Sequence, residues 1–91
     1  MGFHLFSDFY ITIIVDRRAY RLKVEHIYID SVKEQYRVSG RNKSIVVQSN
    51  RPLFRNRGVR HRRPNWKVIE GNVFNSNLDP VYQEILKVVD K

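Results

Sequence analysis

The chain has 91 residues, carries a formal net charge of +8 at pH 7 and contains no cysteine. Hydrophobic residues make up 42% of the sequence, which is enough apolar surface for a folded core but, at this length, for one domain only. The lack of cysteine excludes a disulfide framework, thiolate metal sites and cysteine nucleophiles, and it fits a reducing compartment. We therefore expect a single domain that covers residues 1–91.

The start of the chain is predicted to be an N-terminal tail, residues 1–8. It lacks the basic start and the long apolar run of a secretory signal, and Phe6 stands where the myristoylation pattern requires Ser or Thr. The longest apolar run lies around residues 11–15, far short of the ~20 residues that span a bilayer. We expect a cytoplasmic protein without a transmembrane segment.

A first β-hairpin is predicted after the tail. Its first strand covers residues 9–15, which are nearly all β-branched or aromatic and fit a half-buried pleated surface. A polar break at 16–19 follows, and apolar and charged residues then alternate at period two up to Glu25. Beyond Glu25 the apolar positions shift by one residue, to Ile27 and Ile29, which indicates a bulge or a bend.

A second hairpin completes residues 9–49. Tyr36 and Val38 resume the alternation, and the segment 40–43 supplies the Gly and Asn that a tight turn requires. Residues 44–49 then form the returning strand. The result is a four-stranded antiparallel meander.

Two further elements are predicted beyond a long basic segment. Residues 66–70 alternate like a fifth strand. Asp79 and Pro80 predict a helix start, because the carboxylate accepts the first free N–H groups and a proline at the first helical position loses no hydrogen bond. Apolar residues then recur at helical spacing, so we expect a helix over residues 79–90 that must pack on the sheet to be stable.

Together these elements predict an α+β fold: a β-rich antiparallel sheet of about five strands, with one face covered by the C-terminal helix. The alternation in the strands and the apolar stripe of the helix select the core. The predicted core residues are Ile11, Ile13, Leu22, Val24, Tyr36, Val38, Ile45, Val47, Trp66, Val68, Ile85, Leu86 and Val89.

Residues that carry catalysis or bind metals are few. His4, His26 and His61 are scattered at no ligand spacing, and without cysteine the zinc patterns are absent. The nearest carboxylate pairs flank a turn or begin the helix, so each has a structural explanation. We expect a protein that is not an enzyme, with no catalytic residue, cofactor or metal. An enzymatic site assembled around His61 is a weaker hypothesis.

The charge of the chain is concentrated in one region. No acidic residue occurs between Glu34 and Glu70, and residues 35–69 contain ten basic residues. Pro52, Gly58 and Pro64 interrupt regular structure in the second half of this region, so we predict a basic loop over residues 50–65. Loops of this length are uncommon in compact domains and tend to be functional or disordered.

The basic region favours a partner that carries phosphate groups. Six of the seven Lys and Arg residues from Arg51 to Lys67 are arginine, whose planar guanidinium matches phosphate geometry. Phe54 and Trp66 bracket this run, and aromatic residues beside arginines are typical of proteins that stack single-stranded bases. We predict a small non-enzymatic nucleic-acid-binding module with mainly phosphate contacts to DNA or RNA. The predicted contact residues are Arg41, Lys43, Arg51, Arg55, Arg57, Arg60, Arg62, Arg63, Trp66 and Lys67.

Other functions fit the same features. An exposed sheet edge and the basic loop suit a protein-interaction module, or a subunit of a homo-oligomer, that meets an acidic partner. An anionic membrane also suits a basic loop, but no lipidation motif or apolar face accompanies it. A solvated loop without a partner is the simplest alternative, and the absence of interleaved acidic residues favours binding over solubility alone.

Overall fold

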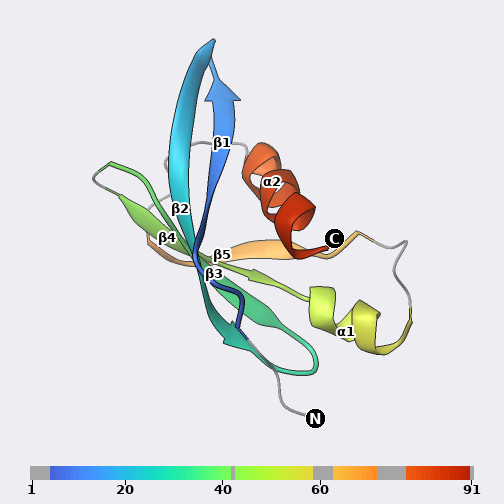
Figure 1. Ribbon diagram of the computed structural model, residues 1–91. Helices are drawn as coiled ribbons and strands as arrows, with labels where there is room; N and C mark the ends of the chain where they lie inside the picture. Colours follow the sequence, from blue (N-terminus) through green and yellow to red (C-terminus); the bar gives the residue numbers. More distant parts are fainter. Residues whose placement is uncertain (1–4, 42, 59–62, 72–77, 91) are drawn as a thin grey trace.

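The computed structural model describes residues 5–41, 43–58, 63–71 and 78–90, and it confirms the α+β fold (Figure 1). Within these residues five strands form one antiparallel sheet in chain order. The strands are β1 (Phe9–Val15), β2 (Arg18–Ile29), β3 (Glu34–Ser39), β4 (Ser44–Ser49) and β5 (Trp66–Gly71). The helices of the described ranges are α1 (Arg51–Asn56) and α2 (Asp79–Val89), and neither has the length and apolar content needed to cross a lipid bilayer.

The first hairpin turns more tightly than its sequence indicates. Its loop consists of Asp16 and Arg17 alone, with Val15 paired to Arg18, whereas we predicted a break over residues 16–19. Both loop residues have positive φ, 51° and 68°, as a type I′ turn requires. The usual signal for this turn is glycine or asparagine, and because neither is present the sequence does not reveal it.

The predicted phase shift in β2 is confirmed as a bulge. The pairing of β2 with β3 shifts between His26 and Tyr28, which leaves Ile27 outside the register. A second shift lies between Val46 and Val47, where β4 pairs with β5. Bulges bend strands and increase their twist, and Figure 1 shows a strongly twisted sheet that curves around α2.

The core lies between the sheet and α2. Every predicted core residue is either buried in this cluster or packed against it. α2 buries Val81, Ile85 and Val89, and Figure 1 places the helix between β1 and β5. This burial is what makes an eleven-residue helix stable, because a helix of that length is marginal on its own.

The start of α2 differs from the prediction by one position. The N-cap is Leu78, which makes no side-chain cap hydrogen bond, so the prediction of Asp79 as the cap is wrong. Asp79 instead lies in the first turn, where its charge is favourable near the positive end of the helix dipole. Pro80 is tolerated beside it because the first N–H groups of a helix have no partner within the helix.

The predicted basic loop is in part a helix. α1 covers Arg51–Asn56, and Pro52 stands in its first turn, where a helix tolerates proline, instead of in its interior. Arg51 and Pro52 are buried, so tertiary contacts stabilise six residues that would not form a helix alone. The ends of the segment are joined: Asn65 N–H donates to Asn50 Oδ1 at 2.7 Å, and Asn50 N–H donates to the Asn65 carbonyl at 3.3 Å.

Candidate nucleic-acid interface

Arg51 does not belong to the predicted interface. Only 4% of the residue is exposed, and its guanidinium donates to the Glu34 carboxylate from Nε at 2.6 Å and from Nη2 at 2.9 Å. Nη1 donates to Oδ1 of Asp90 at 3.1 Å. Arg51 therefore joins the start of α1 to β3 and to the end of α2. The prediction for this residue is wrong because its partner, 17 positions earlier in the chain, is brought to it by the fold.

Glu34 lies at the centre of this buried ion cluster. Nε2 of His26 is 3.1 Å from its Oε1, and the ring of Tyr36 stacks on His26 with centroids 4.6 Å apart. Burial alone would raise the pKa of Glu34, but contacts with His26, Arg51 and Tyr36 lower it to about 2. Burial opposes the charge of Arg51, yet the bonded carboxylate raises the pKa of that guanidinium. The cluster thus keeps one carboxylate and one guanidinium ionised inside the fold.

The other predicted contact residues within the described ranges lie at the surface. The exposed ones are Arg41, Lys43, Arg55, Arg57, Arg63 and Lys67. Trp66 is half-buried and packs against the core. Arg60 and Arg62, together with His61, lie outside the described residues.

The exposed cations do not share one face of the molecule. Arg41 and Lys43 belong to the β3–β4 turn, whereas Arg55 and Arg57 belong to α1 and its C-cap, and these two groups lie at opposite ends of β4 (Figure 1). The six residues of β4 separate them by about 20 Å at the usual rise of a strand. The turn and α1 therefore present two distinct basic surfaces.

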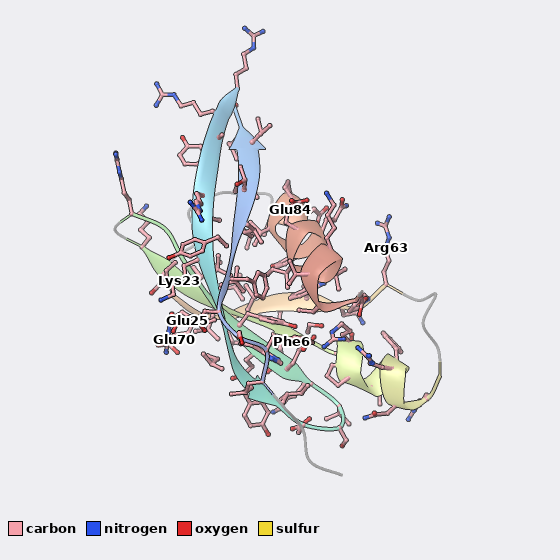
Figure 2. All side chains as sticks on the ribbon, in the orientation of Figure 1. Phe6, Lys23, Glu25, Arg63, Glu70 and Glu84 are labelled. Atoms are coloured by element: carbon pink, nitrogen blue, oxygen red, sulfur yellow. The ribbon has the colours of Figure 1, made fainter. Side chains whose placement is uncertain are left out.

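The open face of the sheet carries charges of both signs. Arg37 is paired with Glu25 in the register of β2 and β3, and their side chains lie 4.0 Å apart. Glu70 lies in the same cross-strand row, because Arg37 pairs with Val46 on β4 and Val46 pairs with Glu70 on β5. Figure 2 shows Glu25 and Glu70 on one side of the sheet. Strand pairing thus places acidic residues beside a region that is free of acid in the sequence.

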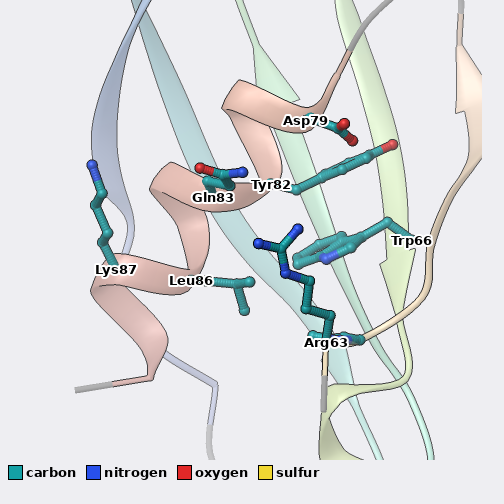
Figure 3. A pocket seen from close by; sticks show the side chains of 8 residues that line it. Arg63, Trp66, Asp79, Tyr82, Gln83, Leu86 and Lys87 are labelled. Atoms are coloured by element: carbon teal, nitrogen blue, oxygen red, sulfur yellow. The ribbon is translucent and has the colours of Figure 1, made fainter. Parts of the chain in front are cut away.

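A groove between β5 and α2 brings Arg63 and Trp66 together. It has a volume of about 460 Å³ (Figure 3). The rings of Trp66 and Tyr82 stack with centroids 4.7 Å apart and an interplanar angle of 9°. Figure 3 shows Arg63 extending beside Trp66 toward α2. Of the predicted contact residues, Arg63 and Trp66 are the pair that lines this groove.

Polar side chains of α2 complete the groove. Asp79, Gln83 and Lys87 line it, and Lys87 also pairs with Glu84 at 2.5 Å. Burial and the charge of Asp79 raise the pKa of Tyr82, so its hydroxyl remains protonated at neutral pH. The groove therefore offers cations to a phosphate, aromatic rings to a planar ligand, and a carboxylate and an amide to hydrogen-bonding groups.

The α2 side of the groove is the part that the sequence does not reveal. Helical periodicity places Tyr82 on the packed stripe and Gln83 and Lys87 toward solvent, and it gives no reason to bring them near Trp66. The connection is tertiary, because it depends on α2 lying beside the edge strand that carries the tryptophan.

In the part of the chain that the structure describes, no three His, Asp or Glu side chains are placed to hold a metal ion. Comparison with protein-family models, curated proteins and solved structures gives no match for this chain. The function is therefore inferred from the residues of the groove and its surroundings.

Proposed function

We propose that the protein is a non-enzymatic module that binds single-stranded nucleic acid in the groove between β5 and α2. The observation that carries this proposal is the meeting of Arg63 with the Trp66–Tyr82 stack in one groove. Guanidinium groups bind phosphate and aromatic rings stack on bases, and a nucleotide carries both partners. Asp79 and Gln83 add groups that accept and donate hydrogen bonds at a base edge.

The dimensions of the groove favour an unpaired strand. Its volume of about 460 Å³ falls within the ~300–1,000 Å³ of small-ligand pockets, which suits one splayed nucleotide. A base inside a duplex cannot enter such a groove without leaving its stack and losing its pair. A single strand offers the same base without that loss.

Exposed cations near the groove provide a path for the phosphate backbone. Arg55 and Arg57 belong to α1 and its C-cap, which follow the end of β4 that pairs with Trp66 of the groove, whereas the β3–β4 turn lies at the other end of β4 (Figure 1). Lys67 follows Trp66 on the edge strand and is exposed. Lys67 lies on the face of β5 opposite to Trp66, because neighbouring residues of a strand point to opposite faces. A strand that leaves the groove toward α1 would pass Arg55 and Arg57, and one that turns around the sheet edge would reach Lys67. Each phosphate contact would release counterions.

Two charge reversals test the location of the site. Arg63→Glu changes the groove, and Arg41→Glu makes the same change in charge at the β3–β4 turn. We expect Arg63→Glu to weaken binding of a fluorescently labelled DNA or RNA strand by about tenfold or more. Arg41→Glu should weaken the same binding by less than about threefold. Fluorescence anisotropy at low salt measures both. Equal losses in the two variants, or no binding of DNA or RNA by the unmodified protein, would contradict the proposal.

The same titration has an internal probe. Trp66 is the single tryptophan of the chain, and its ring lines the groove. A base that stacks beside it should change its fluorescence as the strand is added, in step with the anisotropy. Binding without any change at Trp66 would place the strand elsewhere.

A protein partner is the second candidate, favoured by the edge strand β1. Its seven residues include no charged residue and no proline, and Tyr10 and Ile14 are exposed on it. Unprotected edges of this kind pair with strands of other chains. Two results would support this candidate: self-association of the chain, or capture of another protein in a complex that survives nuclease treatment. In either case the association should be lost on Thr12→Pro. If the protein stays monomeric at every concentration and retains no other protein, a protein partner at β1 is excluded.

A further inference from the structure

The β1–β2 hairpin projects beyond α2 and ends in a basic tip. Figure 1 shows the projection, and in Figure 2 long side chains at the tip extend away from the body of the molecule. Arg17 and Arg18 are exposed and form no ion pair with any described residue. Arg21, further from the tip, differs because its guanidinium lies 4.3 Å from the centroid of the Tyr10 ring. The tip therefore offers two arginines whose charges are not used by the described part of the fold.

The backbone at the tip gives a second observation. Arg17 has a φ of 68°, in the left-handed region that glycine, asparagine and aspartate tolerate best. Its neighbour Asp16, at 51°, is one of those residues, but Arg17 is not. Folding would be better served by a glycine at this position, which relieves the strain without changing the turn. A strained residue that the fold itself does not require points to a role outside folding.

We propose that the tip of the β1–β2 hairpin, through Arg17 and Arg18, is a second phosphate contact for the nucleic acid held in the groove. This inference rests on the proposed function, because it assumes that a strand occupies the groove. The recognised chemistry is the phosphodiester backbone, which guanidinium groups bind with paired N–H donors. That backbone comes either from the continuation of the single strand or from a duplex that adjoins it.

The apolar side chains of the hairpin favour nucleic acid over a membrane at this tip. Ile14 is 71% exposed and Tyr20 is 44% exposed, and the register places them on opposite faces of the ribbon. Tyr10 shares the face of Ile14, but Thr12 lies between them and the Arg21 guanidinium lies over the Tyr10 ring. Insertion into a bilayer surface needs a continuous apolar face, which these side chains do not make. A narrow two-stranded ribbon with apolar sides and a cationic end suits a nucleic-acid groove, since the major groove admits such a ribbon.

Substitution of Arg17 separates binding from folding. Arg17→Gly and Arg17→Asn remove the cation and keep a residue that accepts positive φ, so the thermal midpoint should stay the same or rise. Arg41→Asn, at the tip of the β3–β4 hairpin, removes the same charge as a matched control. The probes are a strand of about six nucleotides, which reaches the groove and its immediate surroundings, a strand of about twenty nucleotides, and the short strand joined to a duplex.

The expected result is specific to the extended probes. Both Arg17 variants should lose roughly threefold to tenfold in affinity for the longer strand, the duplex-tailed strand or both, while the short strand binds as before. Whichever extended probe shows the loss identifies the source of the phosphates. Unchanged affinity for both extended probes would overturn the inference, as would the same loss in Arg41→Asn. If vesicles rich in phosphatidylserine bind the unmodified protein, and the Arg17 variants lose only that binding, the tip serves a membrane instead.

The two proposals fail in different ways. If Arg63→Glu abolishes binding of the short strand while the Arg17 variants bind every probe normally, the groove function stands and the hairpin contact is wrong. If the unmodified protein binds no strand, both are wrong.

Discussion

Arg51 and Arg63 come from one basic stretch, yet their neighbours assign them different roles. Arg51 is almost completely buried and is bonded to Glu34 and Asp90, so its charge stabilises the fold. Arg63 is exposed beside Trp66 and lines a groove. Removing one partner from a buried ion pair leaves an uncompensated charge, whereas an exposed cation costs little to remove. Residue type alone therefore does not distinguish a structural arginine from a binding one.

The buried carboxylate predicts a loss of stability in acid. The pKa of Glu34 is lowered from 4.5 to about 2 in the folded protein, so the folded state binds the proton less readily than the unfolded chain. Its contribution is complete above about pH 4.5 and is lost as the pH falls toward about 2, a change on the order of 3 kcal/mol in the free energy of unfolding. Urea unfolding from neutral pH down to about pH 2 measures this loss.

A double variant provides the control for this pH dependence. Glu34→Gln with Arg51→Met removes both charges together, which avoids leaving either one buried alone. Its free energy of unfolding should fall less steeply over the same acid range, so its stability relative to that of the unmodified protein should rise as the pH decreases. A decline as steep as that of the unmodified protein would show that other carboxylates cause the acid sensitivity.

At the scale of elements, the end of β5 depends on a close backbone approach. Gly71 has a φ of 90°, and a Cβ added there would lie 2.4 Å from the carbonyl oxygen of Ser44 on β4. Gly71→Ala should therefore destabilise the protein by about 1–3 kcal/mol, as measured by urea unfolding. Gly58→Ala is the matched control, since Gly58 also has positive φ but a Cβ there meets nothing within 4 Å. Equal losses in the two variants would mean that backbone conformation alone, and not the contact with Ser44, sets the effect.

At the scale of the whole molecule, the net charge of +8 predicts binding that weakens with salt. If Arg55, Arg57, Arg63 and Lys67 contact the phosphates of a single strand, the logarithm of affinity should fall with the logarithm of salt concentration at a slope of about −3. Anisotropy titrations across a range of NaCl concentrations measure this slope. A slope near zero would mean that stacking holds the strand without phosphate contacts.

Pairing and burial in the sheet were largely predictable, because they depend on short-range patterns. Alternation placed the strands, and the predicted shift beyond Glu25 is the bulge at Ile27. The first hairpin turn was misplaced because Asp16 and Arg17 adopt positive φ without the glycine that signals it. α1 was missed because its stability comes from the burial of Arg51 and Pro52, which no local pattern reports.

By itself, the sequence determined the α+β architecture, most residues of the core and the concentration of cations after Glu34, whereas Leu78 and Val81 join the core without having been predicted there. Periodicity and composition are properties of neighbouring residues, and these features depend on little else. The tertiary structure alone decided which cations remain available, because that depends on partners far apart in the chain. Arg51 is unavailable because it is hydrogen-bonded to Glu34 in the interior. α2 brings Tyr82 to Trp66 and so forms the groove in which we place the strand.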